Sequence, residues 1–332
     1  MRVMDAMRAP GIPAWTVLAI VLALATAGCA GGVAGAPSRS DGGSHALAMP
    51  LLMLSGARLA TAADSSGTPA LAFGAAPFTL FVHPVAVAAR GEDVYIADSG
   101  TRRVYRFVRA LNAMVAFTGV TVGPGTRIAV GSDFSLYVLD PAARRVQQFA
   151  RNGQMLAIFG DDINVGRPVA MVADEARGLF LIADGLYNQI VAFHPLGRAS
   201  YTIALRGDAR NRVLGIAGLA LGASELYVSD PLCRCIARVA RDGGVLETFG
   251  HREIGQPGPI AVDRYQRVFV IDGFTSGIKV FAGGRLIHDL SPAALGLAQI
   301  NDLWISGDLL YVADGVGARV AEMRLAPPRH GE

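Results

Sequence analysis

The sequence predicts an all-β protein assembled from six copies of one four-stranded unit. A short apolar segment that ends in aspartate, first seen as Val94–Asp98 (Val-Tyr-Ile-Ala-Asp), occurs six times. The aspartates follow one another at spacings of 42, 44, 46, 42 and 42 residues, a period typical of a repeat array. A second segment rich in β-branched and aromatic residues follows each aspartate, which indicates a second strand after a short turn. The repeat aspartates are Asp98, Asp140, Asp184, Asp230, Asp272 and Asp314.

Each unit also contains an inner strand before the aspartate strand and an outer strand at its end. The inner strands are expected near residues 84–88, 127–130, 168–172, 216–220, 259–262 and 300–305. Outer strands are clearest at 153–160 and 243–250, each after a polar turn suited to a hairpin. The sixth unit ends too early to hold its own outer strand.

A segment near the start of the repeats is expected to supply the missing strand. A ring of such units has an unpaired edge at its seam unless one terminus completes the unit begun by the other. Residues 70–74 (Ala-Leu-Ala-Phe-Gly) match the Phe-Gly endings of the outer strands. We therefore predict that residues 69–74 close the ring.

Over about residues 70–325 these units resemble NHL repeats, whose blades contain a Val-Tyr-Val-Ala-Asp strand followed by a turn with asparagine. The resemblance implies a six-bladed β-propeller of NHL type, with a β-sandwich as the less favoured alternative. The asparagine of the turn is present only as Asn188. Near its other places stand Arg102, Ala143, Cys233, Ser276 and Ala318.

The N-terminal residues resemble the signal of a bacterial lipoprotein. Arg2 and Arg8 precede an apolar run that is too short for a comfortable membrane span, and residues 26–29 (Thr-Ala-Gly-Cys) are similar to a lipobox. The resemblance implies that Cys29 is lipidated and becomes the first mature residue; ordinary cleavage nearby, with Cys29 an incidental thiol, is the alternative. Ala30 at the next position favours an outer-membrane anchor that faces the periplasm.

These observations divide the chain into four expected parts. Residues 1–28 form the signal peptide, 29–68 a flexible tether rich in Gly, Ala and Ser, 69–326 the propeller, and 327–332 a C-terminal tail. An apolar patch at residues 47–54 interrupts the tether and has no expected place.

The composition argues against nucleic acid as a partner. The chain has 332 residues, of which 52% are hydrophobic and 17% charged, with a net charge of +3. The basic residues are almost all arginine, and Lys279 is the only lysine. An exported chain without interleaved basic and aromatic residues is not expected to bind RNA.

The repeated aspartates are interpreted as residues that stabilise the turns, and the arginines of these turns as a rim on one face. An aspartate at a strand end accepts backbone N–H bonds in the following turn, which makes six catalytic carboxylates the weaker hypothesis. The arginines of these turns gather on one face, as a solvated rim or as a binding face for an acidic protein or polysaccharide. They are Arg102, Arg103, Arg144, Arg145, Arg234 and Arg319.

Cys233 and Cys235 flank a single residue in one of the turns. An exported protein meets an oxidising compartment, so the pair is expected to form a local disulfide, whose small ring is comparatively easy to reduce. A redox role and a metal dithiolate are the alternatives. The absence of nearby histidine or carboxylate partners in the sequence counts against zinc.

The principal hypothesis is a non-enzymatic, lipid-anchored propeller that binds another envelope component and carries no metal or other cofactor. The alternative is a metal-dependent lyase or lactonase-like enzyme that holds zinc or calcium, as some propellers related to NHL proteins do. His83 precedes the first inner strand, but no matching histidines stand in the other repeats. The acidic and amide candidates at inner-strand ends are Asp174, Asp263, Asn301 and Asp302.

Overall fold

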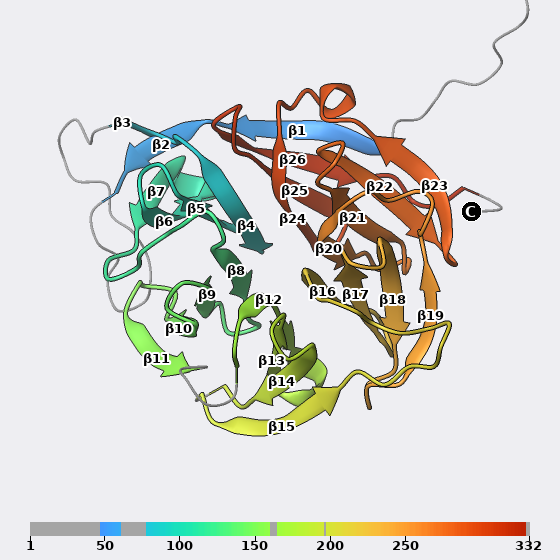
Figure 1. Ribbon diagram of the computed structural model, residues 1–332. Helices are drawn as coiled ribbons and strands as arrows, with labels where there is room; N and C mark the ends of the chain where they lie inside the picture. The colour runs from blue at the N-terminus through green and yellow to red at the C-terminus, as the bar shows by residue number, and fades with distance from the viewer. Residues whose placement is uncertain (1–46, 61–77, 160–164, 196, 330–332) are drawn as a thin grey trace, which may run out of the picture. The chain divides into compact units, whose positions relative to one another are not determined.

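Six sheets form the blades of a β-propeller in the computed structural model, which describes residues 47–60, 78–159, 165–195 and 197–329 (Figure 1). The predicted all-β fold with six four-stranded blades is confirmed. Helical structure in these residues is limited to three 3-10 turns, η1 (Arg109–Leu111), η2 (Glu175–Arg177) and η3 (Ala293–Leu295). No helix within the described ranges has the length and apolar character needed to cross a membrane.

The strands follow the predicted repeat. Blade 1 contains β4 (Pro84–Arg90), β5 (Asp93–Asp98), β6 (Arg103–Val108) and β7 (Ala113–Ala116). Blade 2 contains β8 (Arg127–Val130), β9 (Leu136–Asp140), β10 (Arg145–Phe149) and β11 (Met155–Phe159). Blade 3 contains β12 (Pro168–Asp174), β13 (Leu179–Asp184), β14 (Gln189–Phe193) and β15 (Ala199–Ala204). Blade 4 contains β16 (Gly218–Leu221), β17 (Leu226–Asp230), β18 (Cys235–Val239) and β19 (Val245–Phe249).

Blade 5 contains β20 (Pro257–Val262), β21 (Val268–Asp272), β22 (Gly277–Ala282) and β23 (Arg285–Leu290). Blade 6 contains β24 (Ile300–Ser306), β25 (Leu309–Asp314), β26 (Arg319–Leu325) and, as its outer strand, β1 (Ala48–Leu54). The inner strands β4, β8, β12, β16, β20 and β24 each contact the next around the ring, and β24 contacts β4. The ring is therefore closed around a central channel.

The strand that closes the ring is β1, and the prediction that residues 69–74 do so was wrong. β1 pairs antiparallel with β26, from Ala48 opposite Leu325 to Leu54 opposite Val320 (Figure 1). Residues 69–74 lie outside the described residues. The apolar patch at residues 47–54 was assigned to the tether but is part of the sheet, because its backbone pairs with the otherwise open edge of β26 in blade 6.

The segment after β1 also holds the neighbouring blade. Only Ser55 separates β1 from β2 (Gly56–Leu59), which pairs in parallel with β7 of blade 1 and in turn pairs with β3 (Phe78–Leu80). One continuous segment is therefore hydrogen-bonded to blades 6 and 1, on both sides of the seam. Gly56 allows this path because a Cβ there would collide with the carbonyl oxygen of Thr79.

The apolar core lies between the faces of adjacent blades. The β-branched and aromatic residues of the middle strands point alternately to the two faces, so each sheet packs on both neighbours. Between blades 2 and 3, for example, the rings of Tyr137 and Phe180 stack with centroids 4.2 Å apart, and Phe159 meets Phe180 edge to face. Aromatic pairs of this kind add about 0.5–1.5 kcal/mol each beyond their burial.

Candidate functional site

The repeat aspartates join two parts of their own blade. In blade 3, Oδ1 of Asp184 accepts N–H bonds from Leu186 and Tyr187 in the following turn. The same carboxylate accepts N–H bonds from Gly166 and Arg167, just before the inner strand. Burial by itself would raise the pKa of Asp184, but the four N–H groups outweigh it and hold the pKa below its usual value. The Asp184 carboxylate therefore has a structural role in holding the turn against the start of the inner strand.

Four other repeat aspartates bind their turn and the residues before the inner strand in the same way. They are Asp98, Asp230, Asp272 and Asp314. Asp140 differs, because its Oδ1 accepts bonds only from the turn residues Ala142 and Ala143. The loop before its inner strand is closed on itself instead, through bonds in both directions between Gly123 and Thr126.

The fourth residue after each repeat aspartate has a left-handed backbone conformation. The φ angles at these six positions lie between 51° and 57°. The residues are Arg102, Arg144, Asn188, Arg234, Ser276 and Ala318. Asparagine tolerates this conformation better than most residues, which explains its place in the NHL turn. In blades 2 and 4 the corresponding residues are Arg144 and Arg234, each one position after Ala143 and Cys233, which the sequence placed near the turn asparagine.

The six turns lie on one face of the ring, which we call the turn face. The repeat aspartate of each blade is the last residue of its strand and pairs next to the start of the inner strand, as Asp98 does with Pro84. All inner strands therefore begin at the turn face and end at the opposite face.

Three of the predicted rim arginines form a basic arc on blades 1 and 2, made of Arg102, Arg103 and Arg144. All three are exposed, as is Arg234 in blade 4. None of these four forms an ion pair with another described residue. The other two predicted rim arginines are less available. Arg145 is half-buried, and Arg319 donates to Oδ2 of Asp314 at 3.0 Å and to the carbonyl of Gly296.

An apolar arc, which the sequence analysis missed, covers the same face on blades 3 to 6. Its members have 58% to 83% of their surface exposed. They are Leu186, Tyr187, Leu232, Phe274 and Val316. The signal was present in the repeat, because the second residue after the aspartate is large and apolar in blades 3 to 6 but Gly100 and Ala142 in blades 1 and 2. Exposed apolar side chains gathered in this way are typical of interaction sites.

The central channel contains a cavity of ≈ 230 Å³ lined by residues of the inner strands. Most of the lining is apolar, and four charged side chains contribute: Arg90, Arg127, Glu175 and Asp302. Arg90, the last residue of β4, and Glu175, the first residue after β12, form an ion pair at 2.6 Å. No histidine is among the described residues of this lining.

Asp302 is the most unusual group of the channel. It is buried and accepts an N–H bond from Val87 of the neighbouring inner strand at 3.1 Å. Burial raises the pKa of Asp302 to about 6, and the nearby charge of Arg127 and the bond from Val87 only partly oppose this rise. The channel thus holds a carboxyl group that changes charge near neutral pH.

Of the other candidates for a metal or catalytic site, His83 and Asn301 lie together, with Nδ2 of Asn301 3.5 Å from Nε2 of His83, whereas Asp174 and Asp263 are held in ion pairs elsewhere. His83 is held at the seam of blades 6 and 1, with Nδ1 3.0 Å from the carbonyl of Gly315, and Asn301 donates to the carbonyl of Pro84. Asp174 and Asp263 stand at the ends of β12 and β20 that are far from the turn face. Asp174 is paired with Arg241 at 2.7 Å, and Asp263 with Arg267 at 2.6 Å.

Comparison with known proteins supports the fold alone. No family model and no curated protein matches the chain. Solved structures do match. A virginiamycin B lyase from Staphylococcus aureus has a TM-score of 0.56 and 10% identity over 74% of this chain and 96% of its own. A protein of unknown function from Bacteroides thetaiotaomicron has a TM-score of 0.59 and 16% identity over 82% and 76%. A catalytically inactive variant of the lyase with quinupristin has a TM-score of 0.56 and 12% identity over 84% and 98%.

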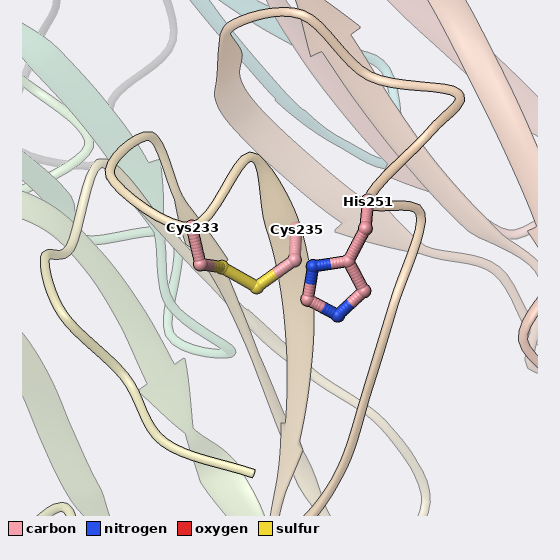
Figure 2. Close-up of side chains that lie close together, drawn as sticks. All are labelled: Cys233, Cys235 and His251. Carbon is pink, nitrogen blue, oxygen red and sulfur yellow. A yellow bond between two sulfur atoms is a disulfide. The ribbon is translucent and has the colours of Figure 1, made fainter. Parts of the chain in front are cut away.

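The cysteine pair in the turn of blade 4 forms a disulfide, Cys233 to Cys235 (Figure 2). His251, in the connection that leads from β19 to blade 5, lies beside it. The histidine partner that the sequence spacing did not show is therefore supplied by a different segment. Cys29, the expected lipidation site, lies outside the described residues.

Proposed function

We propose that this protein is a non-enzymatic binding module of the cell envelope that docks a protein partner on its turn face. The apolar arc is the observation that carries the proposal. Five large apolar side chains stand exposed on four consecutive blades, where burying each would gain about 1.5–3 kcal/mol. Patches of this kind are rarely left uncovered in soluble proteins without a function.

The basic arc indicates what kind of partner would bind to the turn face. Arg102, Arg103 and Arg144 are exposed and form no ion pair with another described residue, so a partner with acidic residues beside an apolar segment complements this face. Some arginines opposite the turn face are paired, as Arg90 is with Glu175 and Arg264 with Asp308. The turn face combines exposed arginines that form no ion pair with the apolar arc.

Site-specific photo-crosslinking in cells tests the docking face. A photoreactive phenylalanine analogue in place of Phe274 or Leu232 is expected to give the same protease-sensitive adduct. The matched control is Leu246, which is 47% exposed on the outer strand β19 and away from the turn face. Adducts at Leu246 alone, or none at any turn-face position, would contradict the proposal, and a protease-resistant adduct would indicate a polysaccharide instead.

A charge reversal in the basic arc distinguishes its contribution to binding from that of the apolar arc. The double substitution R102E and R144E is expected to weaken capture of an acidic partner, and more strongly at low salt, because exposed charges act mainly on association. The control R285E lies on β23 at the outer rim of blade 5 and is expected to leave capture unchanged.

The lipid anchor belongs to the same proposal. The lipobox-like sequence ending at Cys29 supports attachment to the outer membrane, with the propeller on the periplasmic side. Several acyl chains would hold the protein firmly at the membrane surface. Cys29→Ala is expected to move the protein from the membrane fraction to the soluble fraction, and an unchanged distribution would argue against lipidation.

Catalysis in the channel is a second candidate function, favoured by Asp302. A buried carboxyl group whose pKa is raised to about 6 in a cavity is typical of active sites, although it also occurs in structural networks. Under this alternative the protein holds zinc or calcium. Metal analysis of the purified protein decides between the two, since a stoichiometric ion would favour the enzyme.

A further inference from the structure

We propose that Cys233, Cys235 and His251 form a thiol–disulfide exchange site, at which an external dithiol reduces the disulfide reversibly. The three residues come from three segments of blade 4 and its exit. Cys233 lies in the turn, Cys235 begins β18, and His251 follows the outer strand β19. Their sulfur and nitrogen ligand atoms all lie within 4.8 Å of one another (Figure 2). This site is independent of the docking function proposed above.

The fold does not need this disulfide. Asp230 already holds the turn, because its Oδ1 accepts N–H bonds from Leu232 and Cys233. The other five blades keep the same turn without any cysteine. A disulfide that closes a loop across the single residue Arg234 also removes little entropy from the unfolded chain. A purely structural role therefore leaves the pair unexplained.

The two sulfur atoms differ in access, as exchange requires. Cys233 is partly exposed on the turn face, whereas Cys235 has 0% of its surface exposed. An attacking thiolate reaches the accessible sulfur, and the buried one then leaves. The exposed guanidinium of Arg234, between the two cysteines, adds a positive charge that favours thiolates.

His251 lies where it can stabilise and protonate the leaving sulfur of Cys235. Its Nε2 lies 3.1 Å from Oγ1 of Thr248, and Figure 2 shows the other ring nitrogen directed toward the disulfide beside Cys235. An imidazolium at this place stabilises a departing thiolate and donates a proton to it.

The exchange proceeds by two successive attacks of thiolate on disulfide. A thiolate of the external dithiol attacks Sγ of Cys233, the bond between Cys233 and Cys235 breaks, and its electron pair passes to Sγ of Cys235. The Cys235 sulfur takes a proton from His251, which regains one from water. The second thiol of the external dithiol gives its proton to water, and the resulting thiolate attacks the dithiol sulfur that is bonded to Cys233. The bond from that sulfur to Cys233 breaks, and Cys233 leaves as a thiolate, which is protonated by water. The protein disulfide is reduced to two thiols, and the dithiol is oxidised to a disulfide.

The same ligand atoms would suit a thiophilic cation only after reduction, since in the disulfide the two sulfurs are bonded to each other. The observed bond between them therefore favours exchange over a metal dithiolate.

Reduction of the full-length protein by dithiothreitol tests the site. Alkylation and peptide mass spectrometry would follow the two cysteines separately from Cys29, the third cysteine of the chain. His251→Gln is expected to slow reduction about tenfold, because the leaving thiolate loses its stabilising partner. The matched control H194Q, an exposed histidine after β14, is expected to leave the rate unchanged.

Trapping with oxidised glutathione tests the division of roles. C235S is expected to form a mixed disulfide at Cys233, whereas C233S, which leaves only the buried Cys235, is expected to react much more slowly. Equal trapping in the two variants, or equal reduction rates in H251Q and H194Q, would overturn the proposal. A large drop in the melting temperature on reduction would overturn it as well, since the disulfide would then be structural.

Discussion

Ala48 pairs with Leu325 in the sheet of blade 6, so the first described strand and the last strand of the chain lie side by side. This pairing leads to the first prediction. Deleting residues 47–60 is expected to lower the free energy of unfolding by at least about 3–6 kcal/mol, the burial of Leu47 and Leu54 alone. Thermal unfolding measures the loss.

Deletion of residues 30–46 is the control for this prediction, because these residues precede the closing strand. Its melting temperature is expected to match that of the full chain. Equal melting of both deletion variants would contradict closure by β1.

The repeat aspartates are expected to differ in their sensitivity to asparagine. Asp184→Asn replaces an oxygen that accepts the N–H of Gly166 at 2.8 Å, so a buried donor loses its acceptor at a cost of about 1–3 kcal/mol. Asp140→Asn keeps both bonds on one oxygen and is expected to change stability by less than about 0.5 kcal/mol. Urea denaturation of the two variants measures the difference, and equal losses would contradict this account of the turns.

The pH dependence of the Asp184 effect has a definite sign. Its pKa in the folded protein lies below the unfolded value of about 3.9, so its contribution is fully present above that pH. The contribution is lost as the pH falls through the folded pKa. The difference between the original protein and D184N is therefore expected to shrink below about pH 4, and a difference that grows in acid would refute this assignment.

Asp302 is expected to behave in the opposite way. Its folded pKa of about 6 lies above the unfolded value, so the folded protein binds the extra proton and stability falls as the pH rises from about 4 to 6. Asp302→Asn removes this penalty and keeps an acceptor for the N–H of Val87. At pH 7 it is expected to raise the free energy of unfolding by up to about 3 kcal/mol. D308N, at an ion pair with Arg264, is the surface control. A destabilised D302N would contradict the interpretation.

Substitution of Ala318 by glycine is expected to raise the free energy of unfolding. Its φ of 51° costs an L-residue with a Cβ roughly 1 kcal/mol, which glycine avoids. Glycine also loses more backbone freedom on folding, by about 0.4–1 kcal/mol, so A318G is expected to be stabilised by at most about 0.6 kcal/mol. In the control, Ala142 occupies an equivalent turn without a positive φ, so A142G is expected to gain nothing. Differential scanning calorimetry compares the two, and a gain in A142G alone would refute the conformational explanation.

Much of the fold was predictable because the repeat signal is local. The strand that ends at Asp98 and its five counterparts are visible as alternating apolar segments, and the spacing of the aspartates shows six units. Local hydrogen bonding explains why the aspartate recurs, since each turn needs an acceptor for its own N–H groups. The apolar arc was also visible in principle, at the second position after each aspartate in blades 3 to 6.

The sequence by itself determined the number of blades, the first three strands of each blade and the turns after the repeat aspartates, because short-range alternation and turn chemistry specify these features. Only the tertiary structure decided which N-terminal segment closes the ring. Residues 47–54 and 70–74 both have suitable apolar character, and pairing with β26 depends on an edge distant in sequence. The meeting of His251 with Cys233 and Cys235 was decided in the same way, since the antiparallel return of β19 brings the histidine back to the turn face.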